Sequence, residues 1–206
     1  TYCGLSDSYD GASHQAITDL AFVRAIPNMT VITVADAVET KKAVFAIADH
    51  QGPVYLRLSR AAAPVYYSED MKFEIGKGIT VRDGRDVTII TTGTVLHKAL
   101  AAAELLEAKG IQARVVDMHT IKPIDEELII ECARETGAIV TVEEHSVCGG
   151  LGSAVAEVLA EHMPVPMTRI GATDFAESGD YEQLLVKYGY GPESIAERCA
   201  EVIKRK

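Results

Sequence analysis

Segments typical of β-strands and segments with the spacing of amphipathic helices alternate along almost the whole of this 206-residue chain. Such alternation is typical of an α/β fold with a mainly parallel sheet, because parallel strands need a crossover segment between them. Apolar and β-branched runs predict strands at 29–34, 54–59, 73–81, 86–92, 113–118, 138–142 and 167–170, after a strand end at 1–5. Helical spacing predicts helices at 13–25, 36–50, 94–109, 125–137 and 154–162, with two more in the tail.

One stretch without usable periodicity divides the chain. Residues 61–71 contain a proline, two tyrosines and acidic side chains, and they predict a linker between a first block, 1–60, and a second block, 72–206. A block of about sixty residues that opens within a strand end would be marginal as an independent domain. We therefore expect the chain to begin inside a domain, with the front part of that domain upstream of Thr1.

Charge and composition exclude two classes of partner. The net charge is −10, and no basic cluster is larger than the terminal Lys-Arg-Lys, so a nucleic-acid interface is not expected. No apolar stretch approaches the roughly twenty residues that span a bilayer, so no membrane partner is expected. The four cysteines lack CxxC spacing, and Cys132 and Cys199 fall on apolar helix faces. We expect a reduced, cytoplasmic protein without structural zinc or a secretion signal.

A set of polar residues follows the strands of the first block. Ligands of an open parallel sheet bind beyond the carboxyl ends of its strands, and this edge is predicted to carry Asp10, His14, Asp36 and Arg60. A carboxylate, an imidazole and a guanidinium suit a small, hydroxylated, anionic substrate. Asp10 could accept hydrogen bonds from a hydroxyl, His14 could exchange protons, and Arg60 could hold a phosphate.

Each of these residues also has a purely structural interpretation. Ser13 could cap a helix, which would make His14 a solvated residue of the first turn. Asp36 could be a helix cap, with Glu39 completing a capping box. Arg60 could form a surface ion pair of little energetic weight. Spacing alone leaves both sets of interpretations open.

The second block contains three further motifs. Gly149–Ser153 opens a helix after a strand and could bind an anion, but it matches no phosphate-loop pattern, and a tight turn for helix packing is favoured. Glu143, Glu144 and His145 are adjacent on a strand end, where successive side chains point to opposite sides, so no metal site is predicted. Residues 121–125 are predicted to form a strand-to-helix loop that ends in its cap.

Several motifs, in the expected order, resemble one enzyme family. DGASHQAITDLAFVRAIPNMTVITVAD and LRLSR are similar to the pyrimidine-binding domain of transketolases. VVDMHTIKPID, VEEHSVCGGLGSAVAE and ESGDYEQLLVKYG are similar to the C-terminal domain of transketolases and their relatives, most of all to the split, two-subunit bacterial enzymes. The resemblance implies a truncated pyrimidine-binding domain of the thiamine diphosphate type, followed by a mixed, mainly parallel C-terminal domain.

The resemblance also implies a reaction and roles for residues. Transketolases are transferases of the pentose phosphate pathway that move a two-carbon ketol unit between sugar phosphates, using thiamine diphosphate and Mg²⁺. By motif, Asp10 would meet the substrate's hydroxyls, His14 would sit near the thiazolium carbon and the reacting carbonyl, and Arg60 would bind the acceptor's phosphate. The main groups that bind cofactor and metal would lie in a missing N-terminal region or subunit, so the chain alone is expected to be inactive. Family enzymes dimerise, which implies a homo-oligomer.

The sequence departs from the family pattern at the start of the motif. Tyr2, at a predicted substrate-binding position, stands where transketolases usually have a histidine; Ser8–Gly11 replaces Gly-Glu-Asp-Gly, and Ala12 replaces a frequent proline. Two other thiamine enzymes therefore stay open as alternatives, a deoxyxylulose-phosphate synthase and the β subunit of a 2-oxo acid dehydrogenase. A non-catalytic assembly or regulatory module is the alternative from another class.

Overall fold

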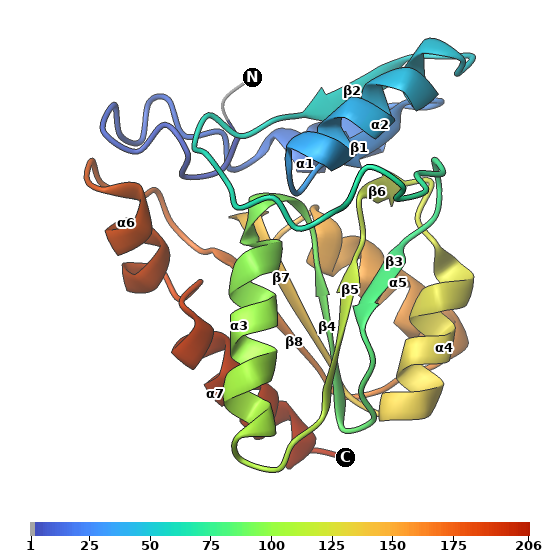
Figure 1. Cartoon of the computed structure of the whole chain (residues 1–206), viewed down its shortest axis with the longest axis vertical. Coiled ribbons are helices and arrows are strands. Elements are labelled where there is room, and N and C mark those ends of the chain that lie inside the picture. Colours follow the sequence, from blue (N-terminus) through green and yellow to red (C-terminus); the bar gives the residue numbers. More distant parts are fainter. Residues whose placement is uncertain (1–2) are drawn as a thin grey trace.

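The computed structural model describes residues 3–206 and contains two sheets (Figure 1), so Tyr2 lies outside the described residues. One sheet has the order β2-β1-β6 and the other β3-β5-β4-β7-β8. The strands are β1 (Thr30–Thr33), β2 (Val54–Arg57), β3 (Ile79–Arg82), β4 (Val87–Thr91), β5 (Ala113–Asp117), β6 (Thr120–Lys122), β7 (Ile139–Ser146) and β8 (Met167–Ala172). The helices are α1 (Asp19–Ala25), α2 (Ala37–Ala48), the short 3₁₀ helix η1 (Gly93–Val95), α3 (Leu96–Glu107), α4 (Glu126–Thr136), α5 (Leu151–His162), α6 (Tyr181–Lys187) and α7 (Pro192–Ile203).

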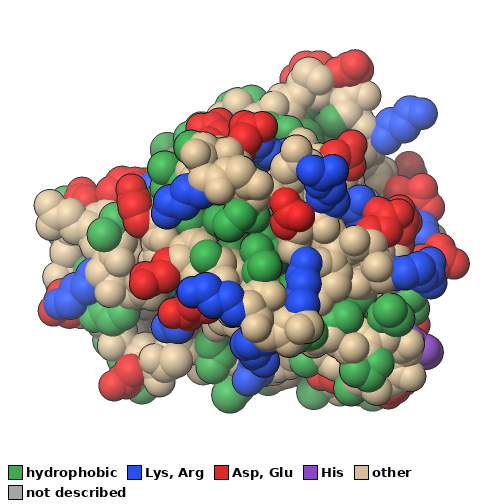
Figure 2. All heavy atoms as spheres, turned by 90° about the horizontal axis from the view of Figure 1, so that it is seen from below, with side chains coloured by type: hydrophobic (Ala, Val, Ile, Leu, Met, Phe, Trp, Pro, Cys, Tyr) green, Lys and Arg blue, Asp and Glu red, His purple; other side chains and the backbone are tan. Residues whose placement is uncertain are grey.

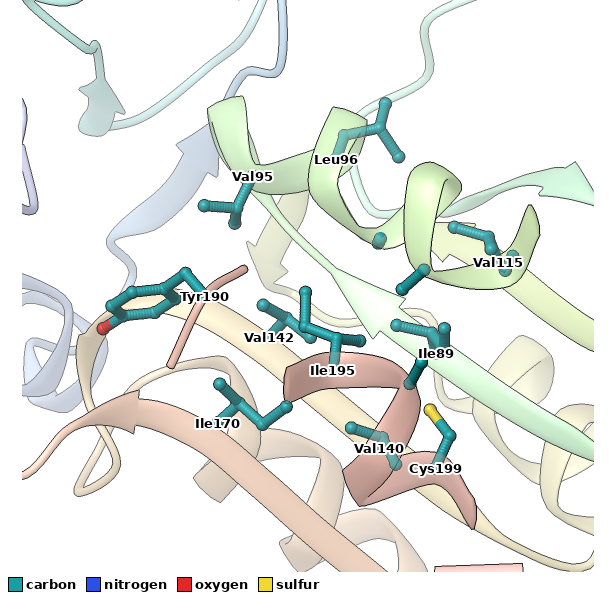
Figure 3. Close-up of a cluster of buried hydrophobic side chains, with 14 of the residues drawn as sticks. Ile89, Val95, Leu96, Val115, Val140, Val142, Ile170, Tyr190, Ile195 and Cys199 are labelled. Atoms are coloured by element: carbon teal, nitrogen blue, oxygen red, sulfur yellow. The ribbon is translucent and has the colours of Figure 1, made fainter. Parts of the chain in front are cut away.

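The five-stranded sheet carries the main core and confirms the predicted mixed, mainly parallel architecture. β5, β4, β7 and β8 pair in parallel, whereas β3 pairs with β5 in the antiparallel sense at one edge. α3 and α7 cover one face and α4 and α5 the other (Figure 1). On the first face, strand residues such as Ile89 and Val142 meet Ile195 and Cys199 of α7 (Figure 3). Because both faces are covered, β4 is buried at every position, including Thr88 and Thr91, as expected for a central strand of a parallel sheet.

The small sheet joins the two blocks. β1 and β2 pair in parallel, but β6 comes from the second block and pairs with β1 in the antiparallel sense, with Val31 opposite Lys122. The backbone N–H of Thr33 also donates to the carbonyl of His119 at 2.8 Å. The prediction of a simple loop over 121–125 was therefore wrong at its start. A three-residue strand has no detectable period, and its partner lies about ninety residues earlier in the chain.

The predicted helix at 13–25 begins later, at Asp19. Residues 11–18 contain one turn, at 12–14, and no helix, because two of their carbonyls have distant partners: Ala16 O accepts the N–H of Gly4 at 2.8 Å, and Ile17 O accepts the N–H of Ser146 at 2.7 Å. Ser13 therefore caps no helix, and its Oγ lies 2.9 Å from Nδ1 of His14. Residues 3–18 are called the site loop below.

The local signals for helix ends were more reliable. Asp36 caps α2 by accepting the N–H of Glu39 at 2.8 Å, and Asp125 caps α4 in the same way. Gly137 ends α4 in the left-handed conformation at φ 66°, and Pro192 occupies the first turn of α7. These features are set by residues that are neighbours in the sequence, which is why sequence reasoning could find them.

Other boundaries moved by a few residues. β7 extends to Ser146 and α5 starts at Leu151, so the motif between them is shorter than the predicted turn. β3 begins at Ile79 rather than at 73, and the Phe73 ring stacks on His119 with ring centroids 4.1 Å apart. Residues 61–71 have no helix or strand, and the exact division at 60 and 72 stays a prediction.

The distribution of charged side chains on the surface and the lengths of the helices bear on two possible partners, nucleic acid and membrane. Figure 2 shows one end of the molecule, where acidic and basic side chains are interspersed over the whole face. Among residues 3–206, no helix combines the length and the apolar character that crossing a bilayer requires.

Candidate functional site

A pocket of about 270 Å³ lies where the site loop meets the end of β2. Its wall combines carboxylates, hydroxyls and one guanidinium, contributed by Ser6, Asp7, Ser8, Tyr9, Asp10, Arg60, Ala61 and Tyr181. The site loop runs beside the segment that precedes α6 (Figure 1), and the N–H of Gly179 donates to Ser8 O at 3.0 Å. Both blocks therefore build the pocket.

Two of the predicted residues meet in this pocket although fifty positions separate them. Nη1 of Arg60 lies 3.1 Å from Oδ2 of Asp10, and both side chains are about half exposed. The same Nη1 pairs with Oδ1 of Asp7, a residue that sequence reasoning did not single out. The hydrogen bond from Arg60 lowers the pKa of Asp10 below its ordinary value, and a hydrogen bond with the carboxyl group of Asp7 acts in the same direction. Asp10 is therefore ionised at neutral pH.

His14 is an exposed side chain at the rim of the same loop. Its backbone N–H donates to Gly11 O at 2.9 Å, which closes the turn from Gly11 to His14, directly after Asp10. His14 lies five residues before α1, which starts at Asp19, and it is not among the residues that line the pocket. The imidazole is thus accessible to a ligand, and the chemical role assigned to it by motif stays a prediction.

Asp36 does not belong to this group. One carboxylate oxygen accepts the N–H of Glu39, and the other accepts the N–H groups of Tyr66 and Tyr67 at 2.7 and 2.8 Å. Both oxygens of this buried side chain are occupied by backbone donors. The structural interpretation of Asp36, a helix cap that also fastens the linker, accounts for its position.

A buried glutamate of the second block supports the site loop. Glu144 on β7 accepts the N–H of Leu5 at 3.1 Å through Oε1. Through Oε2 it accepts the hydroxyls of Thr94 at 2.9 Å and Tyr181 at 2.7 Å. One carboxylate thereby connects the site loop, η1 and α6. The available sequence signal was an acidic pair at the end of an apolar strand, which we considered only as a possible metal ligand and rejected in that role.

A buried ion pair lies beneath the loop. Arg57 at the end of β2 donates to both carboxylate oxygens of Asp19, at 2.7 and 3.1 Å. It also donates to the carbonyls of Ala16 at 2.9 Å and Glu144 at 3.0 Å. Burial alone would raise the pKa of Asp19, but the charge and hydrogen bonds of Arg57 lower it, helped by the Tyr55 hydroxyl. The guanidinium thus fixes the end of the site loop against β7.

The glycine-rich turn before α5 supports the packing interpretation. Glu143 accepts the N–H groups of Leu151 and Gly152 at 2.6 and 2.7 Å, so a carboxyl group of the chain itself already caps the helix N-terminus. Burial raises the pKa of this carboxyl to about 7, and the two N–H groups oppose that shift. A Cβ on Gly149 would lie 2.9 Å from Cα of Ala21, which explains glycine at that close approach.

The matching family models cover nearly the whole chain. Residues 76–195 match the transketolase C-terminal domain, and residues 1–65 match the transketolase pyrimidine-binding domain. A putative transketolase C-terminal section of Methanocaldococcus jannaschii is 47% identical over 210 residues, which cover 100% of this chain and 66% of the relative. A subunit of a 6-deoxy-6-sulfo-D-fructose transketolase of Clostridium is 43% identical over 98% of this chain and 63% of the relative.

A solved structure agrees with these matches. A split-gene transketolase, described as an inactive β4 tetramer, superposes with a TM-score of 0.92 at 48% identity, covering 98% of this chain and 65% of that chain. The present chain spans about two thirds of the length of these relatives. On its sequence, its two matched domains and its fold, this chain belongs to the transketolase family.

Proposed function

We propose that this chain supplies the substrate-side residues of a thiamine diphosphate-dependent transketolase, which transfers a two-carbon ketol unit from a ketose to an aldose. The observation that carries this proposal is the pairing of Asp10 with Arg60 at an open pocket; the exposed His14 follows Asp10 by four residues on the same site loop. All three residues match the family motifs by position, and they lie within residues 1–65, the part of the chain that matches the pyrimidine-binding domain.

Each side chain has a role that fits its surroundings. Asp10, whose pKa is lowered by Arg60, accepts hydrogen bonds from the hydroxyls of the sugar. His14 moves a proton at the oxygen of the reacting carbonyl. Arg60 faces the far end of the acceptor, where the family resemblance implies a phosphate. Tyr2 stays a predicted substrate-binding residue.

The described residues do not fit the diphosphate and metal part of the cofactor. Residues 3–206 contain no group of three His, Cys, Asp or Glu side chains that could hold a metal ion, and the N-terminus of α5 is occupied by Glu143. When bound, thiamine diphosphate supplies the carbanion chemistry. We therefore assign the binding of thiamine diphosphate and Mg²⁺ to a partner region or subunit, in a homo-oligomeric assembly at least dimeric. The isolated chain is then inactive; its cytoplasmic location and its place in the pentose phosphate pathway stay predictions.

Reconstitution tests the proposal. The chain, mixed with the polypeptide that carries the cofactor-binding domain, should transfer ketol units only when thiamine diphosphate is present. His14→Ala should lose most turnover, about 100-fold or more, as expected for removal of a general acid–base group. His162→Ala changes an exposed histidine on α5 and is the matched control.

The alternatives give different outcomes in the same assay. Turnover of pyruvate in place of ketoses would favour a deoxyxylulose-phosphate synthase or a 2-oxo acid dehydrogenase. Full activity of the His14→Ala variant would indicate a non-catalytic assembly module. Ketol transfer without thiamine diphosphate would contradict the proposal directly.

A further inference from the structure

The carboxylate of Asp7 has an unusual position in the pocket. Its side chain is only 2% exposed, although it lies on the site loop beside side chains that are half exposed. Oδ1 pairs with the guanidinium of Arg60, while Oδ2 is buried and has no hydrogen-bond partner among the described residues. Asp7 is therefore a buried carboxylate that is already incompletely satisfied.

The buried carboxylate of Asp7 holds the guanidinium of Arg60 at the wall of the pocket through their ion pair. A buried carboxylate is tolerated when a cation or several hydrogen bonds compensate it. Arg60 supplies that compensation, and its backbone N–H is also held, at 3.1 Å from the hydroxyl oxygen of Ser6. If the guanidinium moved outward to bind a ligand, the charge of the buried Asp7 carboxylate would be left without a compensating cation. Arg60 is thus less available to an anion than an arginine on a neutral wall.

The balance of charge points in the same direction. Arg60 is shared by Asp7 and Asp10, so two carboxylates face one guanidinium. Among the described residues that line the pocket, Arg60 is the basic one, and the polar side chains besides Asp7 and Asp10 are hydroxyls such as Ser8 and Tyr9. A phosphate dianion entering here would meet an excess of negative charge. The hydroxyls of an uncharged sugar end would instead find carboxylate acceptors.

We propose that Asp7 selects against a terminal phosphate at Arg60, so that this pocket takes the uncharged, hydroxyl-bearing end of a sugar. The proposal rests on the proposed ketol transfer and names the substrate class of the same site. It departs from what the family resemblance implies for Arg60, because the resemblance does not include a carboxylate at position 7.

Asp7→Asn tests the proposal, since it removes the charge and keeps the shape. In the reconstituted enzyme, kcat/KM is measured with glyceraldehyde and with glyceraldehyde 3-phosphate as acceptors. The wild type should prefer glyceraldehyde, and Asp7→Asn should shift the ratio toward the phosphate ester about tenfold or more. Asp7→Leu should shift it in the same direction. Asp83→Asn, in the exposed turn after β3, makes the same change of charge outside the pocket and should leave the ratio unchanged.

A second readout separates failure of this proposal from failure of the proposed function. Inorganic phosphate is titrated into the chain itself while the side-chain N–H signal of Arg60 is followed by NMR. Asp7→Asn should bind phosphate about tenfold more tightly than the wild type. Equal phosphate affinity, or a ratio of acceptors that stays within twofold, would overturn the selection by Asp7. Absence of ketol transfer with both aldehydes, together with tighter phosphate binding by Asp7→Asn, would overturn the reaction and leave the anion selection standing.

Discussion

Replacement of Arg57 by methionine should be among the most destabilising single changes in this chain. The guanidinium is 2% exposed and donates four hydrogen bonds, two to Asp19 and one each to the carbonyls of Ala16 and Glu144. Methionine fills a similar volume but leaves the Asp19 carboxylate, whose side chain is 8% exposed, without its cation. Removing one partner of a buried ion pair costs about 3–5 kcal/mol. In a chain of this length that corresponds to a fall in Tm of about 6–20 °C.

The pH dependence of the variant gives a sharper signature than its stability alone. In the wild type Arg57 lowers the pKa of Asp19, so the pair stabilises the fold above the ordinary pKa of a carboxyl and loses that contribution as the pH falls through the lowered value. Without Arg57, burial dominates and raises the pKa of Asp19. Folded Asp19 then holds a proton that the unfolded chain releases, so the stability of Arg57→Met should fall as the pH rises from about 4.

Urea unfolding followed by circular dichroism measures both effects. The double variant Arg57→Met, Asp19→Leu should be more stable than Arg57→Met alone, because it removes the uncompensated carboxylate. Arg198→Met is the control, since the exposed pair of Arg198 with Glu201 at 3.1 Å contributes little, within about 0.5 kcal/mol. A loss below about 1 kcal/mol for Arg57→Met, or strictly additive single changes, would refute the reasoning.

Two further predictions concern packing and burial. Gly149 and Gly110 share a positive φ of 82° and 79°, but an added Cβ would lie 2.9 Å from Cα of Ala21 in the first case and meet nothing within 4 Å in the second. Gly149→Ala should therefore cost several kcal/mol in urea unfolding and Gly110→Ala only about 1 kcal/mol, and equal losses would contradict the packing argument. Burial raises the pKa of Asp117 to about 7 from its ordinary 3.8, beside the buried Glu39. The folded state keeps that proton while the unfolded state loses it, so stability should fall from about pH 4 to pH 7, and Asp117→Asn should reduce this fall in unfolding midpoints at pH 5 and 8; an unchanged slope would count against it.

Local signals explain why much of the fold was predictable. The alternation of strands and helices, the caps Asp36 and Asp125 and the glycine at 137 depend on residues within a few positions of one another. The helix predicted from Ser13 was wrong at its start because the carbonyls of Ala16 and Ile17 are bound by distant backbone groups. No local pattern reports such competition.

The residues of the candidate site also differ in whether local sequence patterns could predict them. The sequence predicted Asp10 and Arg60 at one edge, and their side chains pair in the structure. The strand end predicted at 1–5 was wrong in its described part, because Cys3 forms only an isolated bridge with Ala16, and Gly4 and Leu5 lie in a turn. Asp7 was missed because an aspartate in a loop of serines, aspartates and a tyrosine is indistinguishable by sequence from a solvated one. Its burial depends on Arg60, fifty-three positions away. Glu144 was missed for the same reason, since its ligands come from three separate elements.

These long-range contacts show how the second block acts on a pocket that the first block largely forms. Glu144 on β7 holds Leu5 at the start of the site loop, and its carbonyl accepts the buried Arg57 at the end of β2. β6 extends the small sheet from the same block. A shift of β7 would therefore displace the loop that carries Asp7 and Asp10 relative to Arg60. Because the ion pairs around Arg60 depend on that register, the C-terminal domain determines the electrostatics of the pocket chiefly through side chains that line no part of it.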